Sequence, residues 1–212
     1  MKRFGVIGAG PVGQTLAAGL KEHGYDVRIA SRSPEKLTMF STTKAIPSGT
    51  FADVAAWAEG LVLAVQGRAA VEALRIAGEK NIKGKLVIDT TNPISSDPPD
   101  NGVIRYFTSP NSSLGEQLQA AFPDAHIVKA FNSVGHAFMV NPSFHGKPTM
   151  FYCGNDEKAK AITEKILDQF GWEPADMGSI VSSRAIEPLC QLWCIPGFRE
   201  KRWHHAFKLL RG

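Results

Sequence analysis

The sequence predicts an α/β protein: a doubly wound, mostly parallel sheet followed by a short C-terminal helical extension. Short apolar runs of strand length alternate with segments of helical periodicity along most of the chain. Such alternation is typical of a parallel sheet that helices cover on both faces. The 212 residues, of which 43% are hydrophobic, suffice for one domain with a full core.

The first half of the chain supplies four apolar runs that we interpret as strands. A helix follows the first run, with Val12, Leu16 and Leu20 at a spacing of four and Gly24 as its stop. A second helical segment lies between the third and fourth runs. The four predicted strands span residues 3–7, 27–30, 61–65 and 86–89.

The second half continues the alternation of strands and helices. Ser113 and Glu116 have the spacing of a capping box, which predicts the start of a helix. Two more apolar runs, 126–131 and 149–153, are predicted strands, and an amphipathic helix that ends at Gly171 follows them.

From residue 179 the pattern changes, so we divide the chain into a sheet domain, 1–178, and a C-terminal helical extension, 179–212. Ile186 and Trp193 have helical spacing, and Pro188 must lie in a first turn or at a kink. The basic C-terminal tail is expected to form a solvated amphipathic helix. Docking to an anionic partner or a membrane surface is the alternative.

Composition argues against several classes of function. Lys plus Arg is 24 and Asp plus Glu is 20, and the net charge of only +4 argues against a nucleic-acid-binding surface. Three cysteines cannot build a disulfide framework, so we expect a cytoplasmic protein. The longest uncharged run, 4–20, contains five glycines and a proline, so we expect no membrane span.

The strongest motif is Gly8-Ala9-Gly10-Pro11-Val12-Gly13, which follows the first predicted strand and opens the first helix. A Gly-x-Gly-x-x-Gly turn in this context is typical of the Rossmann-type dinucleotide-binding fold. Gly8 permits the tight turn, Gly10 lets the backbone approach a pyrophosphate, and Gly13 allows close packing of helix on strand. We expect the whole motif to bind the cofactor, with the N–H groups of the helix N-terminus facing its phosphates.

The residues after the second strand, Ser31-Arg32-Ser33-Pro34-Glu35-Lys36, indicate which dinucleotide binds. Enzymes that prefer NAD place an acid at this strand end to hold the ribose 2′-hydroxyl. Here Arg32 and Lys36 offer cations to a 2′-phosphate, and Ser31 and Ser33 offer hydroxyl donors. The sequence therefore predicts NADP(H). Ordinary solvated charges at a helix start are the alternative interpretation.

Three further strand ends are expected to border the nicotinamide, because ligands of doubly wound sheets lie outside the carboxyl ends of the strands. Asn92 and Asn132 could fix the carboxamide or a second ring by hydrogen bonds, although asparagine at a strand end is also a common turn former. The segments are Ala64-Val65-Gln66, Thr90-Thr91-Asn92-Pro93 and Ala130-Phe131-Asn132-Ser133.

Five segments of the chain together carry a resemblance to a known family: the glycine motif, Ser31-Arg32-Ser33, Val128-Lys129-Ala130-Phe131-Asn132, Asp176-Met177-Gly178-Ser179 and Ser182-Ser183-Arg184-Ala185-Ile186-Glu187. They resemble the NADPH-dependent oxidoreductases that reduce the deazaflavin coenzyme F420, and equally the NADPH-binding domain of the STEAP metalloreductases. The resemblance covers nearly the whole chain, and Asn132 agrees better with the STEAP-like branch.

The resemblance implies a homodimeric Rossmann domain in which hydride passes between NADP(H) and a flavin or deazaflavin ring stacked on the nicotinamide. Such a transfer depends on how the two rings are held rather than on an acid–base pair, and we predict no catalytic acid or base. By position, Gly10, Pro11, Val12, Ser31, Arg32 and Lys36 would bind the adenosine and phosphates, Val65, Gln66, Asn92 and Pro93 would border the nicotinamide, and Ala130, Asn132 and Ser133 the acceptor ring.

Two other functions stay open at this point: a reductase of a small carbonyl or imine, and a non-catalytic NADPH sensor that presents residues 179–212 to a partner. Cys190 and Cys194, at a helical spacing of four, are expected to fill one helix face rather than to bind a metal. His136 is expected to be an ordinary polar loop residue, with a place in the acceptor pocket as the alternative.

Overall fold

The computed structural model describes residues 1–212 and contains one eight-stranded sheet. The strands are β1 (Arg3–Ile7), β2 (Asp26–Ala30), β3 (Ser48–Gly49), β4 (Gly60–Leu63), β5 (Leu86–Asp89), β6 (His126–Lys129), β7 (Thr149–Gly154) and β8 (Glu173–Asp176). Their order is β3-β2-β1-β4-β5-β6-β7-β8. The first six strands pair in parallel, β7 is antiparallel to β6, and β8 is parallel to β7. The predicted mostly parallel sheet is confirmed.

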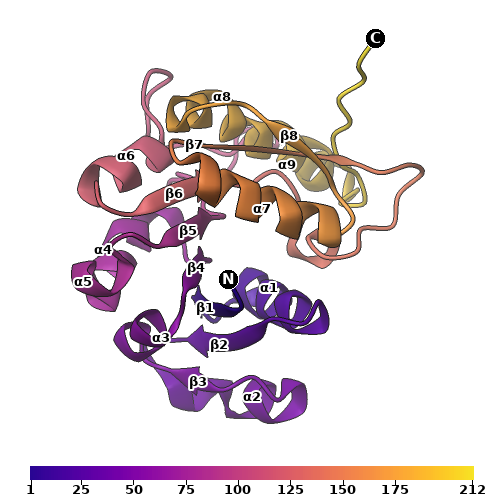
Figure 1. Ribbon diagram of the computed structural model, residues 1–212. Coiled ribbons are helices and arrows are strands. Elements are labelled where there is room, and N and C mark those ends of the chain that lie inside the picture. Colours follow the sequence, from indigo (N-terminus) through magenta and orange to yellow (C-terminus); the bar gives the residue numbers. More distant parts are fainter.

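Helices cover both faces of this sheet (Figure 1). The α-helices are α1 (Pro11–Glu22), α2 (Thr38–Lys44), α3 (Phe51–Trp57), α4 (Ala70–Ala77), α5 (Glu79–Ile82), α6 (Leu114–Ala121), α7 (Glu157–Gln169), α8 (Ser183–Ile186) and α9 (Pro188–Glu200). Short 3-10 turns are η1 (Pro34–Leu37), η2 (Gly67–Ala69), η3 (His136–Phe138) and η4 (Ile180–Ser182). Leu20 of α1 and Leu167 of α7 belong to one core, whereas Val54, Leu74 and Leu118 of α3, α4 and α6 belong to the other. This two-layer covering confirms the doubly wound architecture.

The strand ends that matter for a ligand come earlier than the sequence predicts. β4 ends at Leu63 and β6 ends at Lys129, two residues before the expected ends in each case. After β6 the chain turns sharply, because Phe131 has a left-handed backbone with φ +62°. The segments 64–66 and 130–133 therefore form loops at the carboxyl edge of the sheet rather than its last strand residues.

The C-terminal extension is helical only in part. Pro188 lies in the first turn of α9, as predicted, and the helix ends where Lys201 adopts a left-handed backbone with φ +56°. Residues 201–212 contain no helix, so the predicted amphipathic helical tail is wrong. Trp203 turns back onto α9, where a Cβ added at Gly197 would lie 2.2 Å from its ring, and Thr149 N donates a hydrogen bond to Phe207 O at 2.9 Å.

The division of the chain into a sheet domain, 1–178, and a C-terminal helical extension, 179–212, stays a prediction.

The helices of the structure are all too short or too polar to cross a bilayer.

Candidate functional site

The glycine turn joins β1 to α1 at the centre of the sheet, where the strand order reverses between β1 and β4. Gly8 has φ +129°, and a Cβ added there would lie 2.2 Å from the carbonyl oxygen of Ala64. A Cβ added at Gly13 would lie 2.0 Å from the carbonyl oxygen of Gly8. Both positions therefore require glycine for the close approach of β1, α1 and β4.

Gly10 differs from these two glycines, because an added Cβ there would meet no atom within 4 Å. It is the N-cap of α1, has an extended backbone and offers no side chain to cap the helix. Pro11 occupies the first turn, which contains no acidic residue. The backbone is thus open to an approaching group, and the N–H groups of the first turn favour an anion there. These features fit the pyrophosphate of a dinucleotide.

The loop after β2 lies beside the glycine turn, since Gly8 N donates a hydrogen bond to Ala30 O at 3.1 Å. Ser33 N donates to Ser31 Oγ at 3.1 Å, which orders the loop. Arg32 and Lys36 are exposed, and neither side chain makes an ion pair or hydrogen bond within the protein. Two free cations and two hydroxyl groups fit an adenosine ribose that carries a 2′-phosphate.

The strand-end segments meet around two amides. Asn92 Nδ2 donates to Asn132 O at 2.8 Å, and Asn132 Nδ2 donates to Asn92 Oδ1 at 3.1 Å and to Ile186 O at 3.0 Å. The structure therefore brings Asn92 and Asn132 together, and their contacts with the nicotinamide and the acceptor ring stay a prediction. Asn132 is only 3% exposed, however, and its Oδ1 has no hydrogen-bond partner.

The remaining predicted site residues divide by exposure. Ala64, Pro93, Ala130 and Ser133 are buried at the strand ends, and Val65 is half-buried. Gln66 is exposed, and its Oε1 accepts hydrogen bonds from Arg68 at 3.0 and 3.1 Å. The open surface at this edge is therefore formed by Val65, Gln66 and Asn92, with the other side chains packed beneath it.

A buried ion network lies under these strand ends and was not predicted. Lys129 Nζ lies 2.6 Å from Asp89 Oδ2 and 2.9 Å from Glu187 Oε1, and all three side chains are buried. Burial alone would lower the pKa of Lys129, but the two carboxylates outweigh it and raise this pKa above its usual value. A lysine inside an apolar strand, 126–131, is the sequence signal that could have indicated a paired charge.

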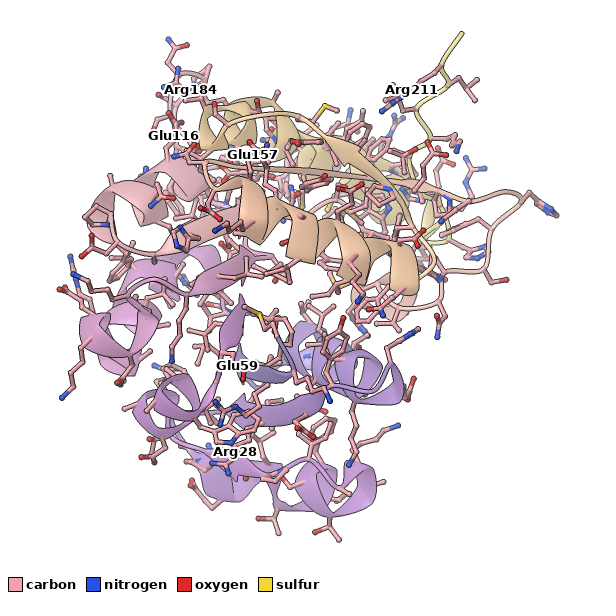
Figure 2. The ribbon with its side chains drawn as sticks, in the orientation of Figure 1. Arg28, Glu59, Glu116, Glu157, Arg184 and Arg211 are labelled. Carbon is pink, nitrogen blue, oxygen red and sulfur yellow. The ribbon has the colours of Figure 1, made fainter.

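The C-terminal segment is attached to α6 by two carboxylates. Glu187 accepts hydrogen bonds from the backbone N–H groups of Leu114 and Gly115, at 3.0 and 2.9 Å, and so satisfies the N-terminus of α6. On the surface, Arg184 binds Glu116 through two nitrogens at 2.9 and 2.6 Å; Figure 2 shows the two side chains together. The Ser-Ser-Arg-x-x-Glu segment thus has a structural explanation, because its Arg and Glu anchor α8 to α6.

Two of the cysteines lie on α9, and the third, Cys153, is the β7 residue that pairs with Lys129 at the end of β6. Cys190 is buried and Cys194 is half-buried on α9, so the pair lines one side of the helix. Cys153 is buried in the sheet, and burial raises the pKa of its thiol to about 11. The structure contains no group of three or more His, Cys, Asp or Glu side chains arranged to hold a metal ion.

Comparison with known proteins agrees with this geometry. The sequence profile of the family described as NADP oxidoreductase, coenzyme F420-dependent, matches residues 3–93. A crystal structure of a candidate F420-dependent NADP reductase from Arthrobacter sp. FB24 superposes with a TM-score of 0.92, at 32% identity, over 98% of this chain and 99% of that one.

Two curated relatives are more distant. The metalloreductase STEAP3 of Rattus norvegicus is 26% identical over 92% of this chain and 38% of its own length. The F420-dependent NADP reductase of Methanocaldococcus jannaschii is 29% identical over 54% of this chain and 51% of its own length. The chain thus spans about half or less of the curated relatives it matches. With the similarity to the Arthrobacter protein extending over both whole chains, this protein belongs to the family of coenzyme F420-dependent NADP oxidoreductases.

Proposed function

We propose that the protein binds NADP(H) along the glycine turn, with its 2′-phosphate held by Arg32, Ser31, Ser33 and Lys36. The observation that carries this proposal is an exposed arginine without a protein partner, beside an uncapped helix N-terminus. A cation left free at this strand end supports a ligand with an additional phosphate, because a ribose 2′-hydroxyl would be held by an acid instead.

The acceptor in this proposal is a flavin or deazaflavin ring at the ends of β5 and β6, stacked on the nicotinamide. NADPH, when bound, supplies the hydride. The ionisable side chains nearest these strand ends, Asp89, Lys129 and Glu187, are buried and cannot exchange protons with a substrate. The accessible residues at this edge, including Asn92 and Val65, offer an amide and an apolar contact. Such a surface supports ring positioning rather than acid–base chemistry.

The name of one relative, an F420-dependent NADP reductase, supports a deazaflavin acceptor, and the metalloreductase relatives support a reductase without naming a flavin. The decisive test is the oxidation of NADPH in the presence of FMN, FAD, riboflavin or F420 as separate acceptors. Turnover with one of them is expected. NADPH binding without turnover in any of the four would instead favour a cofactor sensor.

We also propose that the protein forms a homodimer through α9 and the loop that contains Ile104 and Phe107. Leu192, Phe198 and Phe107 are each about half exposed, and Gln191 Nε2 holds the loop to α9 by donating to Ile104 O at 2.8 Å. Exposed apolar side chains on neighbouring segments support a contact surface. Light scattering is expected to give twice the chain mass of 23.0 kDa, and the mass of one chain would contradict the dimer.

A further inference from the structure

Lys129 joins three segments of the chain at one buried point. Its Nζ contacts Asp89 at the end of β5 and Glu187 at the start of α9, and it also donates a hydrogen bond to Thr91 O at 2.8 Å. The side chain is 0% exposed. It therefore acts on its surroundings only through these partners.

The partners of Lys129 connect it to the two strand-end amides, Asn92 and Asn132. Thr91 directly precedes Asn92, and Asp89 Oδ1 accepts hydrogen bonds from Thr91 N at 2.9 Å and Thr91 Oγ1 at 2.6 Å. On the other side, Glu187 directly follows Ile186, whose carbonyl oxygen accepts the hydrogen bond from Asn132. The network thus fixes Asn92 through Thr91 and Asn132 through Ile186.

A buried ion network of this kind contributes little net stability to a core. Burying ions costs several kcal/mol for each one before their attraction is counted, and apolar side chains of similar volume often stabilise a protein equally well. Asp89, Lys129 and Glu187 nevertheless lie where the loops after β5 and β6 begin. This arrangement favours a role in fixing the geometry of those loops.

We propose that Lys129 is a positioning residue for the reacting rings, acting through Thr91–Asn92 on one side and Glu187–Ile186–Asn132 on the other. The proposal rests on the proposed function, because it takes these loops to border the nicotinamide and its acceptor. Lys129 touches neither ring. Its contribution is the fixed separation of the two strand ends.

The test removes the ions without leaving an unpaired charge. Lys129→Met alone would bury two carboxylates without a cation and is expected to unfold the protein. The test variant is therefore the uncharged triple substitution Asp89→Asn, Lys129→Met and Glu187→Gln. Because Glu187→Gln also removes one of the two hydrogen bonds to the N-terminus of α6, the single Glu187→Gln variant, which keeps the pair of Asp89 and Lys129, controls for that loss. The matched control is Lys160→Met, which removes another nearly buried lysine that contacts two carboxylates, Glu157 at 2.8 Å and Asp176 at 2.9 Å.

Two measurements separate positioning from folding and do not require turnover. The affinity for 2′,5′-ADP, which lacks the nicotinamide, is expected to be unchanged in the triple variant. The fluorescence lifetime of bound NADPH, which reports how firmly the nicotinamide ring is held, is expected to shorten. The Lys160→Met control is expected to keep both the wild-type affinity for 2′,5′-ADP and the wild-type lifetime.

Turnover adds a third measurement. With FMN as acceptor, kcat of the folded triple variant is expected to fall about 10–100-fold, as for a misplaced reacting group, and the primary isotope effect with deuterated NADPH is expected to rise. A folded triple variant with the wild-type lifetime, kcat and isotope effect would overturn the positioning role. Absence of turnover in the wild type would count against the proposed function, while a shortened lifetime would still support positioning of the nicotinamide.

Discussion

The carbonyl oxygen of Gly8 occupies the space that a side chain at Gly13 would need, since a Cβ there would lie 2.0 Å from that oxygen. Gly13→Ala must therefore push α1 away from β1. We expect the free energy of unfolding to fall by about 1–3 kcal/mol, the usual range for overpacking. Urea denaturation measures the change, and an unaltered midpoint would show that the turn can relax.

Gly10→Ala is expected to weaken cofactor binding and to leave the stability of the protein unchanged. Its backbone has φ −74°, which alanine adopts freely, and its added Cβ would meet no protein atom within 4 Å. The midpoint of unfolding should not change. The affinity for NADPH should fall about 10-fold or more, because the methyl group would displace the phosphates from charge-assisted bonds worth about 1.5–3 kcal/mol each. Titration of NADPH fluorescence measures the affinity, and wild-type binding would place the pyrophosphate elsewhere.

Arg32→Ala is expected to change cofactor preference. Loss of a charge-assisted contact to the 2′-phosphate should weaken NADPH binding about 10–100-fold and leave NADH binding nearly unchanged. Arg75→Ala is the control, because Arg75 is an exposed arginine on α4 that lies 3.9 Å from Glu72. Equal losses for NADPH and NADH in the Arg32 variant would exclude a 2′-phosphate contact.

The fold could be predicted where apolar runs carry the information. β1 and β5 have the bounds that the sequence predicts, since both are central strands in which every residue except Arg3 is buried. β8, with the sequence Glu-Pro-Ala-Asp, was missed. As an edge strand it has neither an apolar run nor a continuous row of N–H donors, and charge and proline are common at such edges.

The candidate site could be identified from the sequence where its residues are adjacent in the chain. The glycine turn and the Ser31–Arg32–Ser33 loop are local motifs, so their chemistry is visible in the chain. The ion network of Asp89, Lys129 and Glu187 is not local, because its members are 40 and 58 residues apart along the sequence. The parallel pairing of β5 with β6 places Asp89 opposite Lys129, and the junction of α8 and α9 adds Glu187 to the pair.

The Arg184–Glu116 pair should make the free energy of unfolding depend on pH. Its hydrogen bonds from Arg184 hold the pKa of Glu116 below its usual value of 4.5. A carboxyl group with a lowered pKa in the folded state stabilises the protein above the unfolded pKa, and this contribution is lost as the pH falls through the folded pKa. The wild type should therefore exceed Arg184→Gln in free energy of unfolding at neutral pH.

That difference should shrink as the solution is acidified. Urea denaturation of both proteins between about pH 6 and about pH 3 covers the titration of an ordinary glutamate. Lys83→Gln is a suitable control, since it removes a surface pair with Asp124 at 2.9 Å and leaves Glu116 unchanged. A difference between wild type and Arg184→Gln that is the same at both ends of this range would contradict the assignment to Glu116.

The three cysteines should react with a thiol reagent in a fixed order. A hydrogen bond from Cys190 lowers the pKa of Cys194, which is also half-buried, and the same interaction together with burial raises the pKa of Cys190. Cys153 is fully buried, with its pKa raised to about 11. Because the thiolate is the reactive form, DTNB at neutral pH should label Cys194 first. Cys194→Ser should abolish the fast phase and Cys153→Ser should keep it, whereas a fast phase that survives in Cys194→Ser would place the reactive thiolate on Cys190 or Cys153.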